Sequence, residues 1–128
     1  MFFEKDELEL PTSSIKDECQ KVLDLDDTIR FVGRIKNRQV IAFVRRDISE
    51  PLLDEEMGNL AHYQASVKAS MEEMFDGRLG KTNWMITCKE FVKMITLFLD
   101  DGLLILSIES KGNHDEIIQK IQGLDTKF

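Results

Sequence analysis

The side chains best suited to metal binding or nucleophilic chemistry are two histidines and two cysteines. His62 and His114 are far apart in the sequence, and no histidine or cysteine lies one helical turn from His62. A metal site needs several ligands that converge on one point. Cys19 falls on the apolar face of an expected helix and Cys88 in an expected strand, where small buried thiols are common. The spacing of these four residues predicts structural roles and no metal site.

Three other stretches resemble parts of active sites. Ser66 and Ser70 share a helical face with Tyr63, but the spacing supplies neither a base nor an oxyanion hole. Residues 76–81 (Asp-Gly-Arg-Leu-Gly-Lys) lack the Gly-Lys-Ser/Thr ending of a phosphate loop, and they follow a helix instead of a strand. The Asp-Asp-Gly at 100–102 offers paired carboxylates for acid–base chemistry, but these are also the residue types that a tight turn requires. We therefore expect no catalytic residue, no cofactor and no enzymatic activity.

The basic residues are concentrated in one short block. The chain has a net charge of −7, yet residues 28–46 carry six bases and no acid. Arg30 and Arg34 lie on one face of an expected strand, and Arg38 lies across the following turn. The block is either a solvated strand, or a partner of the acidic helix expected at 13–27, or a docking patch for a protein, or a contact for nucleic acid. Nucleic acid is the least favoured, because the chain is acidic and the nearby aromatic residues fall on the opposite face.

Length and composition indicate one domain. An acidic lead-in over residues 1–11 precedes a single domain over 12–128. No apolar run approaches the ~18 residues that a membrane span needs. The first three residues, Met-Phe-Phe, are followed at once by acids, unlike a signal peptide. We expect a cytoplasmic protein that does not enter a membrane.

A helix and a β-hairpin are expected in the first part of the domain. The helix follows N-cap residue types and ends near residues 25–27, and its apolar residues recur at helical spacing (Ile15, Cys19, Val22, Leu23). Residues 28–35 alternate as a half-buried strand, with Ile29, Phe31 and Ile35 on one face. After a turn at 36–38, residues 39–44 are apolar on both faces, so we expect both faces of that strand to be covered.

A long helix is expected from about Leu53 to Phe75, followed by a stop signal at 76–80. Its main apolar stripe predicts core packing (Leu53, Met57, Leu60, Gln64, Val67, Met71, Met74, Phe75). Three alanines add a smooth flank at i, i+4 and i+8 (Ala61, Ala65, Ala69). The functional alternative is that Met57, Gln64 and Met71 face a second subunit, because a polar residue within an apolar row sets register between helices.

Three strands and a short helix complete the domain. Strands are expected at 82–88, 91–99 and 103–108, and a helix capped by Asn113 follows and ends at Gly123. The first of these strands is a candidate sheet edge, where Trp84 and Ile86 would meet a second copy of the chain. The order α-β-β-α-β-β-β-α predicts an α+β fold. We expect a five-stranded antiparallel sheet, with the long helix on one face and the terminal helices on the other.

The element order over 13–124 resembles the roadblock/LC7 (dynein light chain 7) family of the profilin-like folds. The resemblance rests on the hairpin Ile29–Val44, the helix Leu53–Phe75 and the segment Phe98–Ser107, in which an acidic-glycine turn leads into a buried strand. The chain is also similar to uncharacterised archaeal proteins of that type. The resemblance implies a homodimeric or heterodimeric platform that binds small GTPases or motor subunits.

Two functions of different classes follow. The leading hypothesis is a non-enzymatic homodimer that binds a protein partner, such as a small GTPase, through its dimer surface or through a patch of Arg30, Arg34 and Arg38. The alternative is a sensor domain that holds a small molecule beside the sheet, which predicts a sizeable internal pocket.

Overall fold

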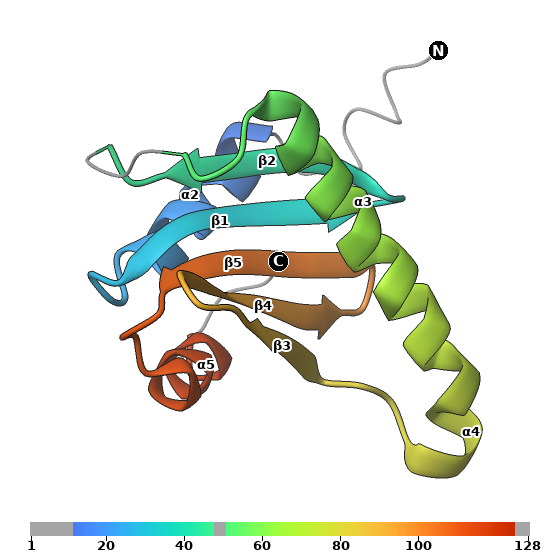
Figure 1. The fold of residues 1–128 in the computed structure, drawn as a ribbon. Coiled ribbons are helices and arrows are strands. Elements are labelled where there is room, and N and C mark those ends of the chain that lie inside the picture. The colour runs from blue at the N-terminus through green and yellow to red at the C-terminus, as the bar shows by residue number, and fades with distance from the viewer. Residues whose placement is uncertain (1–11, 48–50, 125–128) are drawn as a thin grey trace.

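The computed structural model describes residues 12–47 and 51–124, so the expected lead-in over 1–11 lies outside the described residues. A five-stranded antiparallel sheet forms the centre of the fold, with helices on both faces (Figure 1). The predicted α+β class and the predicted order of the main elements are therefore confirmed. In chain order the elements are α2 (Thr12–Leu23), β1 (Ile29–Lys36), β2 (Gln39–Arg45), α3 (Glu55–Glu72), the 3-10 turn η1 (Glu73–Phe75), α4 (Asp76–Leu79), β3 (Trp84–Cys88), β4 (Val92–Leu99), β5 (Gly102–Glu109) and α5 (His114–Gln122).

The strand order explains why α3 must cross the sheet. The order is β2-β1-β5-β4-β3, so β2 and β3 form the two edges and β5 pairs with β1 in the middle. The chain leaves β2 at one edge and must reach β3 at the other. In Figure 1, α3 crosses in front of the strands, and its C-terminal end extends past them with α4.

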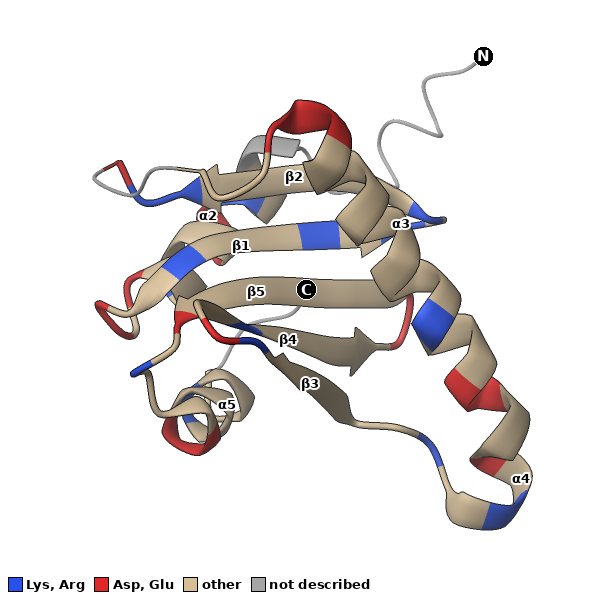
Figure 2. Ribbon diagram, in the orientation of Figure 1, with Lys and Arg blue, Asp and Glu red and all other residues tan. Residues whose placement is uncertain are grey.

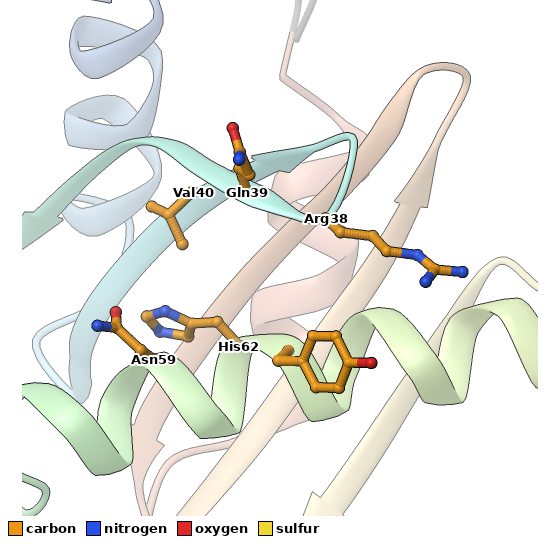
Figure 3. Close-up of a pocket in the computed structure, with 6 residues that line it drawn as sticks. Arg38, Gln39, Val40, Asn59 and His62 are labelled. Carbon is orange, nitrogen blue, oxygen red and sulfur yellow. The ribbon is translucent and has the colours of Figure 1, made fainter.

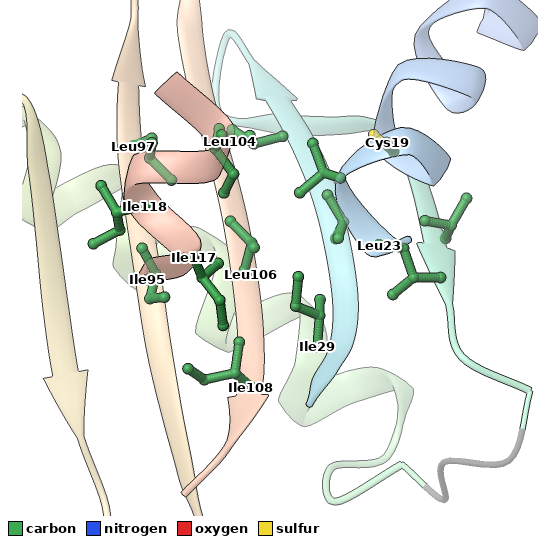
Figure 4. Close-up of a cluster of buried hydrophobic side chains, with 14 residues drawn as sticks. Cys19, Leu23, Ile29, Ile95, Leu97, Leu104, Leu106, Ile108, Ile117 and Ile118 are labelled. Carbon is green, nitrogen blue, oxygen red and sulfur yellow. The ribbon is translucent and has the colours of Figure 1, made fainter. Parts of the chain in front are cut away.

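The larger core lies on the face covered by α2 and α5, which we call the first face (Figure 4). Both helices place apolar residues one turn apart against the sheet (Cys19, Val22, Leu23, Ile117, Ile118, Ile121). They pack on isoleucine, leucine and valine side chains of the central strands, and this burial stabilises the fold. As predicted, Asn113 caps α5: its side chain accepts a hydrogen bond from the backbone N–H of Glu116 at 3.1 Å.

Strand β1 departs from the predicted alternation. The pairing of β1 with β5 shifts register between Ile29 and Phe31. Ile29 joins Val32 in the first-face core, whereas Phe31 and Ile35 pack on the opposite, second face. The prediction that Ile29, Phe31 and Ile35 share a face is wrong, because an extra residue in a strand reverses the direction of the side chains that follow.

Strand β2 is covered along its first face but only in part on its second face. Ala42 and Val44 are buried on the first face, but the side chain of Phe43 is 52% exposed. The prediction that both faces of this strand are covered holds at Val40, which packs against the second-face cluster, and is wrong at Phe43, because α3 crosses this edge strand only in part.

Helix α3 packs on the second face through its small residues. Ser66 and Ala69 are its buried residues, and Ala65 packs beside them. The prediction that the large apolar stripe is core is wrong, because the alanine flank allows the helix to approach the strands closely and turns the stripe outward. Asp54 caps the helix, and the expected stop at 76–80 instead holds one more helical turn that ends at Gly80, φ 86°. None of the described helices is long and apolar enough to cross a membrane.

Two turns shape the middle of the sheet. The predicted turn between β1 and β2 places Asn37 and Arg38 at φ 53° and 65°, as a two-residue hairpin requires. The predicted Asp-Asp-Gly turn joins β4 to β5. Gly102 ends that turn against β1, where a Cβ atom would lie 2.1 Å from the carbonyl oxygen of Ile35. Only glycine fits this approach.

Candidate functional site

The outward side of α3 exposes several large apolar side chains. We call Met57, Leu60, Gln64 and Met71 the outer face of α3, since they recur at helical spacing away from the sheet. The side chains of Met57, Leu60 and Met71 are 49%, 58% and 58% exposed. Exposed large hydrophobic residues continue beyond the sheet into η1 and α4 (Met74, Phe75, Leu79). A contiguous apolar patch of this kind is typical of an interface.

The structure thus brings together three of the five residues predicted to meet a second subunit, namely Met57, Gln64 and Met71, on one exposed surface. The other two lie elsewhere. Trp84 pairs with Leu97 and Ile86 with Ile95, and residues opposite each other on paired strands point to the same face.

Trp84 and Ile86 therefore lie on the first face of the sheet, across from α3. Ile86 also packs against the first-face core. On the α3 side, β3 instead presents Met85 and Thr87, which the sequence reasoning missed. Strict alternation puts both on the face opposite Ile86, but only the pairing with β4 shows that this is the face that α3 covers. Strand β3 is an edge strand, as expected. A second copy that contacted both α3 and β3 would therefore pair with the free backbone groups of β3.

The predicted basic patch is not formed, because Arg34 is a buried residue with 2% exposure. Its guanidinium donates to the carbonyl oxygen of Ile35 at 2.9 Å and forms an ion pair with Asp101. Arg30 stands at the start of β1, and Arg38 is exposed in the turn after its end. The charged positions of the hairpin are visible in Figure 2. The three arginines do not share one surface.

Arg46 is a structural residue that the sequence reasoning missed. Its Nε donates to the carbonyl oxygen of Ile29 at 2.8 Å, and its Nη2 donates to those of Leu23 at 2.8 Å and Asp26 at 3.0 Å. Pairing of the basic block with the acidic helix at 13–27 was one of the alternatives that the sequence left open. Arg46 instead binds the backbone at the C-terminal end of α2, where unpaired carbonyl groups favour a cation.

A groove lies between β2 and α3. This β2 groove encloses about 290 Å³ and is lined by Arg38, Gln39, Val40, Asn59, His62 and Tyr63. In Figure 3, Val40 points from β2 towards His62 and Asn59, while Arg38 extends outward from the turn. A second hollow of about 300 Å³ is lined by Leu23, by one polar residue of α2 and by the charged residues 45–47 at and after the end of β2. Both are open to solvent and at the small end of the range for ligand sites, so they give the sensor hypothesis little support.

An aromatic stack lies beside this groove and includes His62, which lines it. The Phe31 ring stacks on Phe43, with centroids 5.7 Å apart, and on His62, with centroids 5.4 Å apart. The guanidinium carbon of Arg45 lies 5.3 Å from the Phe31 centroid. The stack fixes the N-terminal half of α3 on the sheet. It also provides rigid aromatic surface, because each ring restrains the next.

Burial, together with the nearby charge of Arg45, lowers the pKa of His62 from its ordinary value of 6.5. The unfolded chain then takes up a proton more readily than the fold. The stability that the fold gains by keeping His62 neutral is fully present above about pH 6.5. It is lost as the pH falls towards the pKa of His62 in the folded state. We expect His62→Phe, which keeps the stack, to show a flatter dependence of unfolding free energy on pH between about 7 and 5. Urea unfolding at several pH values measures this.

The control is Tyr63→Phe, which changes the exposed neighbour of His62 in α3, leaves the His62 stack in place and should keep the wild-type loss of stability on acidification. Equal pH profiles for wild type and His62→Phe would contradict the assignment to His62.

The remaining candidate groups have structural surroundings. Burial raises the pKa of the Cys19 thiol to about 11, which makes it a poor nucleophile. Cys88 is exposed at the β3 edge. Among the described residues, no group of three or more histidine, cysteine, aspartate or glutamate side chains is arranged to hold a metal ion.

No family model matches the sequence, and no curated protein matches it either. Solved structures do match the fold. MglB from Myxococcus xanthus has a TM-score of 0.70 at 9% identity, covering 89% of this chain and 84% of that one. A roadblock/LC7 domain from Streptomyces avermitilis has a TM-score of 0.67 at 8% identity, covering 84% and 88%. An MglB with a tetrameric arrangement has a TM-score of 0.68 at 10% identity, covering 90% and 87%. The chain therefore has the roadblock/LC7 fold.

Proposed function

We propose that this protein is a non-enzymatic interaction module that forms a homodimer and binds a protein partner. The observation that carries the proposal is the outer face of α3. Its large apolar side chains are exposed, while Ala65 and Ala69 of the same helix pack on the sheet. Covering these side chains would remove apolar surface from water, which is the main driving force for association. The tetrameric arrangement of a structure with the same fold is consistent with self-association.

The same surface suggests how two copies would meet. The outer faces of two α3 helices would pack together, with Gln64 as the polar position that sets their register. The two β3 edges would lie side by side and pair through their backbones. Met85 and Thr87 would then face the helices, and Trp84 would lie on the opposite side of the extended sheet.

As the partner we propose a small GTPase, on the ground of the resemblance to roadblock proteins. Small GTPases from the same organism, loaded with GDP or with a GTP analogue, would be titrated against the purified protein and followed by calorimetry. Absence of binding by every GTPase would reject this partner class and leave the dimer proposal in place.

The dimer is tested by the mass in solution. We expect light scattering over a range of concentrations to give twice the chain mass of 14.8 kDa. The double variant Leu60→Glu/Met71→Glu should give the monomer mass, because two charges would be buried without partners. Phe43→Glu is the matched control, since Phe43 is also more than half exposed but lies at the other edge of the sheet. A monomeric wild type at every concentration would reject the proposal.

A further inference from the structure

Strand β2 is the second edge of the sheet, and the proposed dimer leaves it open. The order β2-β1-β5-β4-β3 places β2 and β3 at opposite ends. Within the described residues, β2 pairs with β1 only. An edge strand offers a row of backbone donors and acceptors that an extended peptide can complete.

The side of β2 that faces α3 carries a hydrophobic anchor. In the pairing of β1 with β2, Phe43 lies opposite Gly33, which follows Phe31 by two residues in β1. The Phe43 ring stacks on the Phe31 ring. Its own ring is half exposed. Phe31 also stacks on His62. The Phe43 side chain therefore rests on a restrained ring and loses little conformational entropy when a partner covers it.

Positive charge flanks this anchor at both ends. Arg45 lies opposite Phe31 and is exposed on the same side as Phe43. Arg38 is exposed at the turn and lines the β2 groove, and the groove lining contains no acidic residue. Arg45 and Phe43 are two positions apart, so a paired strand would present two alternate side chains to them. A strand that matched this surface would carry an acidic and an apolar residue two positions apart.

We propose that the β2 edge and the β2 groove bind an extended acidic peptide segment of a protein partner. The segment adds to the sheet as a sixth strand beside β2. Its apolar side chain packs on Phe43, and its carboxylates meet Arg45 and Arg38. This site is separate from the proposed dimer surface, so loss of either activity leaves the other measurable.

The first test is selection from a displayed library of random peptides about ten residues long, enough to cover an edge strand. Enriched peptides should carry an acidic residue two positions from a large apolar one. A synthetic copy of an enriched peptide should shift the amide NMR signals of Gln39–Arg45 in the protein. No enrichment, or enrichment of basic or uncharged peptides, would overturn the proposal.

The second test uses variants. Arg45→Glu and, separately, Phe43→Ser should each weaken binding of the selected peptide about tenfold or more. Lys111→Glu is the matched control, because it makes the same change of charge at an exposed residue between β5 and α5 and should leave the affinity unchanged. Equal affinity for the wild type and Arg45→Glu would overturn the proposal.

A third test separates peptide recognition from simple anion binding. A single-stranded oligonucleotide with the same net charge as the selected peptide should bind more weakly and should leave the signals of the β2 edge in place. If it binds as tightly and shifts the same signals, the site recognises charge alone and the strand-addition proposal is wrong.

Discussion

Replacing Gly102 by alanine is expected to destabilise the fold by about 3 kcal/mol, the largest effect of any single substitution that we consider. The added methyl group would lie 2.1 Å from the carbonyl oxygen of Ile35 and 2.8 Å from Nη1 of Arg34. The carbonyl belongs to the interior strand β1 and cannot move without disturbing its pairing with β5. Relief would therefore separate the β4–β5 turn from β1 and weaken the ion pair of Arg34 with Asp101. Urea unfolding followed by circular dichroism measures the loss.

Gly58→Ala is the matched control. Gly58 lies inside α3, and a Cβ atom there meets nothing within 4 Å. Alanine should stabilise the helix by about 0.5–1 kcal/mol, because glycine is a poor helix former. If Gly102→Ala and Gly58→Ala unfold at the same urea concentration, the close approach at Gly102 has no energetic weight.

Replacing Arg46 by alanine should destabilise the fold by about 2 kcal/mol. The substitution removes the donor to three carbonyl oxygens, on Leu23, Asp26 and Ile29, which fix the end of α2 to the start of β1. These acceptors are only partly buried, so water replaces some of the lost bonds and limits the effect. Thermal unfolding followed by circular dichroism measures the change.

Arg45→Ala tests whether this effect is specific to Arg46. Arg45 is the neighbouring residue and is exposed, with its guanidinium over the Phe31 ring. Removing it should cost less than about 1 kcal/mol, the usual range for an exposed cation–π contact. A loss for Arg45→Ala as large as that for Arg46→Ala would show that the carbonyl contacts carry no special weight.

The elements of the fold were predictable because their signals are local. The Asp-Asp-Gly turn and the Asn113 cap depend on the chemistry of a few neighbouring residues. The orientation of α3 was not predictable in this way. Its large apolar stripe and its alanine flank have the same helical period, and only the presence of the sheet selects the alanines for close packing.

The site was predictable only in part, for similar reasons. Met57, Gln64 and Met71 were recognised as a candidate interface because they share one helical face. The burial of Arg34 depends on Asp101, which lies 67 residues away in the chain. The role of Arg46 depends on backbone carbonyl groups, which every residue has and no sequence pattern marks. The side-chain directions along β3 follow from a pairing register that the sequence of that strand alone does not specify.

The helices on the two faces of the sheet bury unequal amounts of apolar side chain. Helix α5 buries three isoleucines, whereas the 18-residue α3 buries only Ser66 and Ala69. The free energy of local opening follows buried apolar contact, so we expect α3 to open from the strands while the first-face core stays intact. Its amide hydrogens should then exchange with solvent through these partial openings. A partner that binds α3 only in its docked position suppresses the openings, and slowed exchange along this one helix reports that its outer face is occupied.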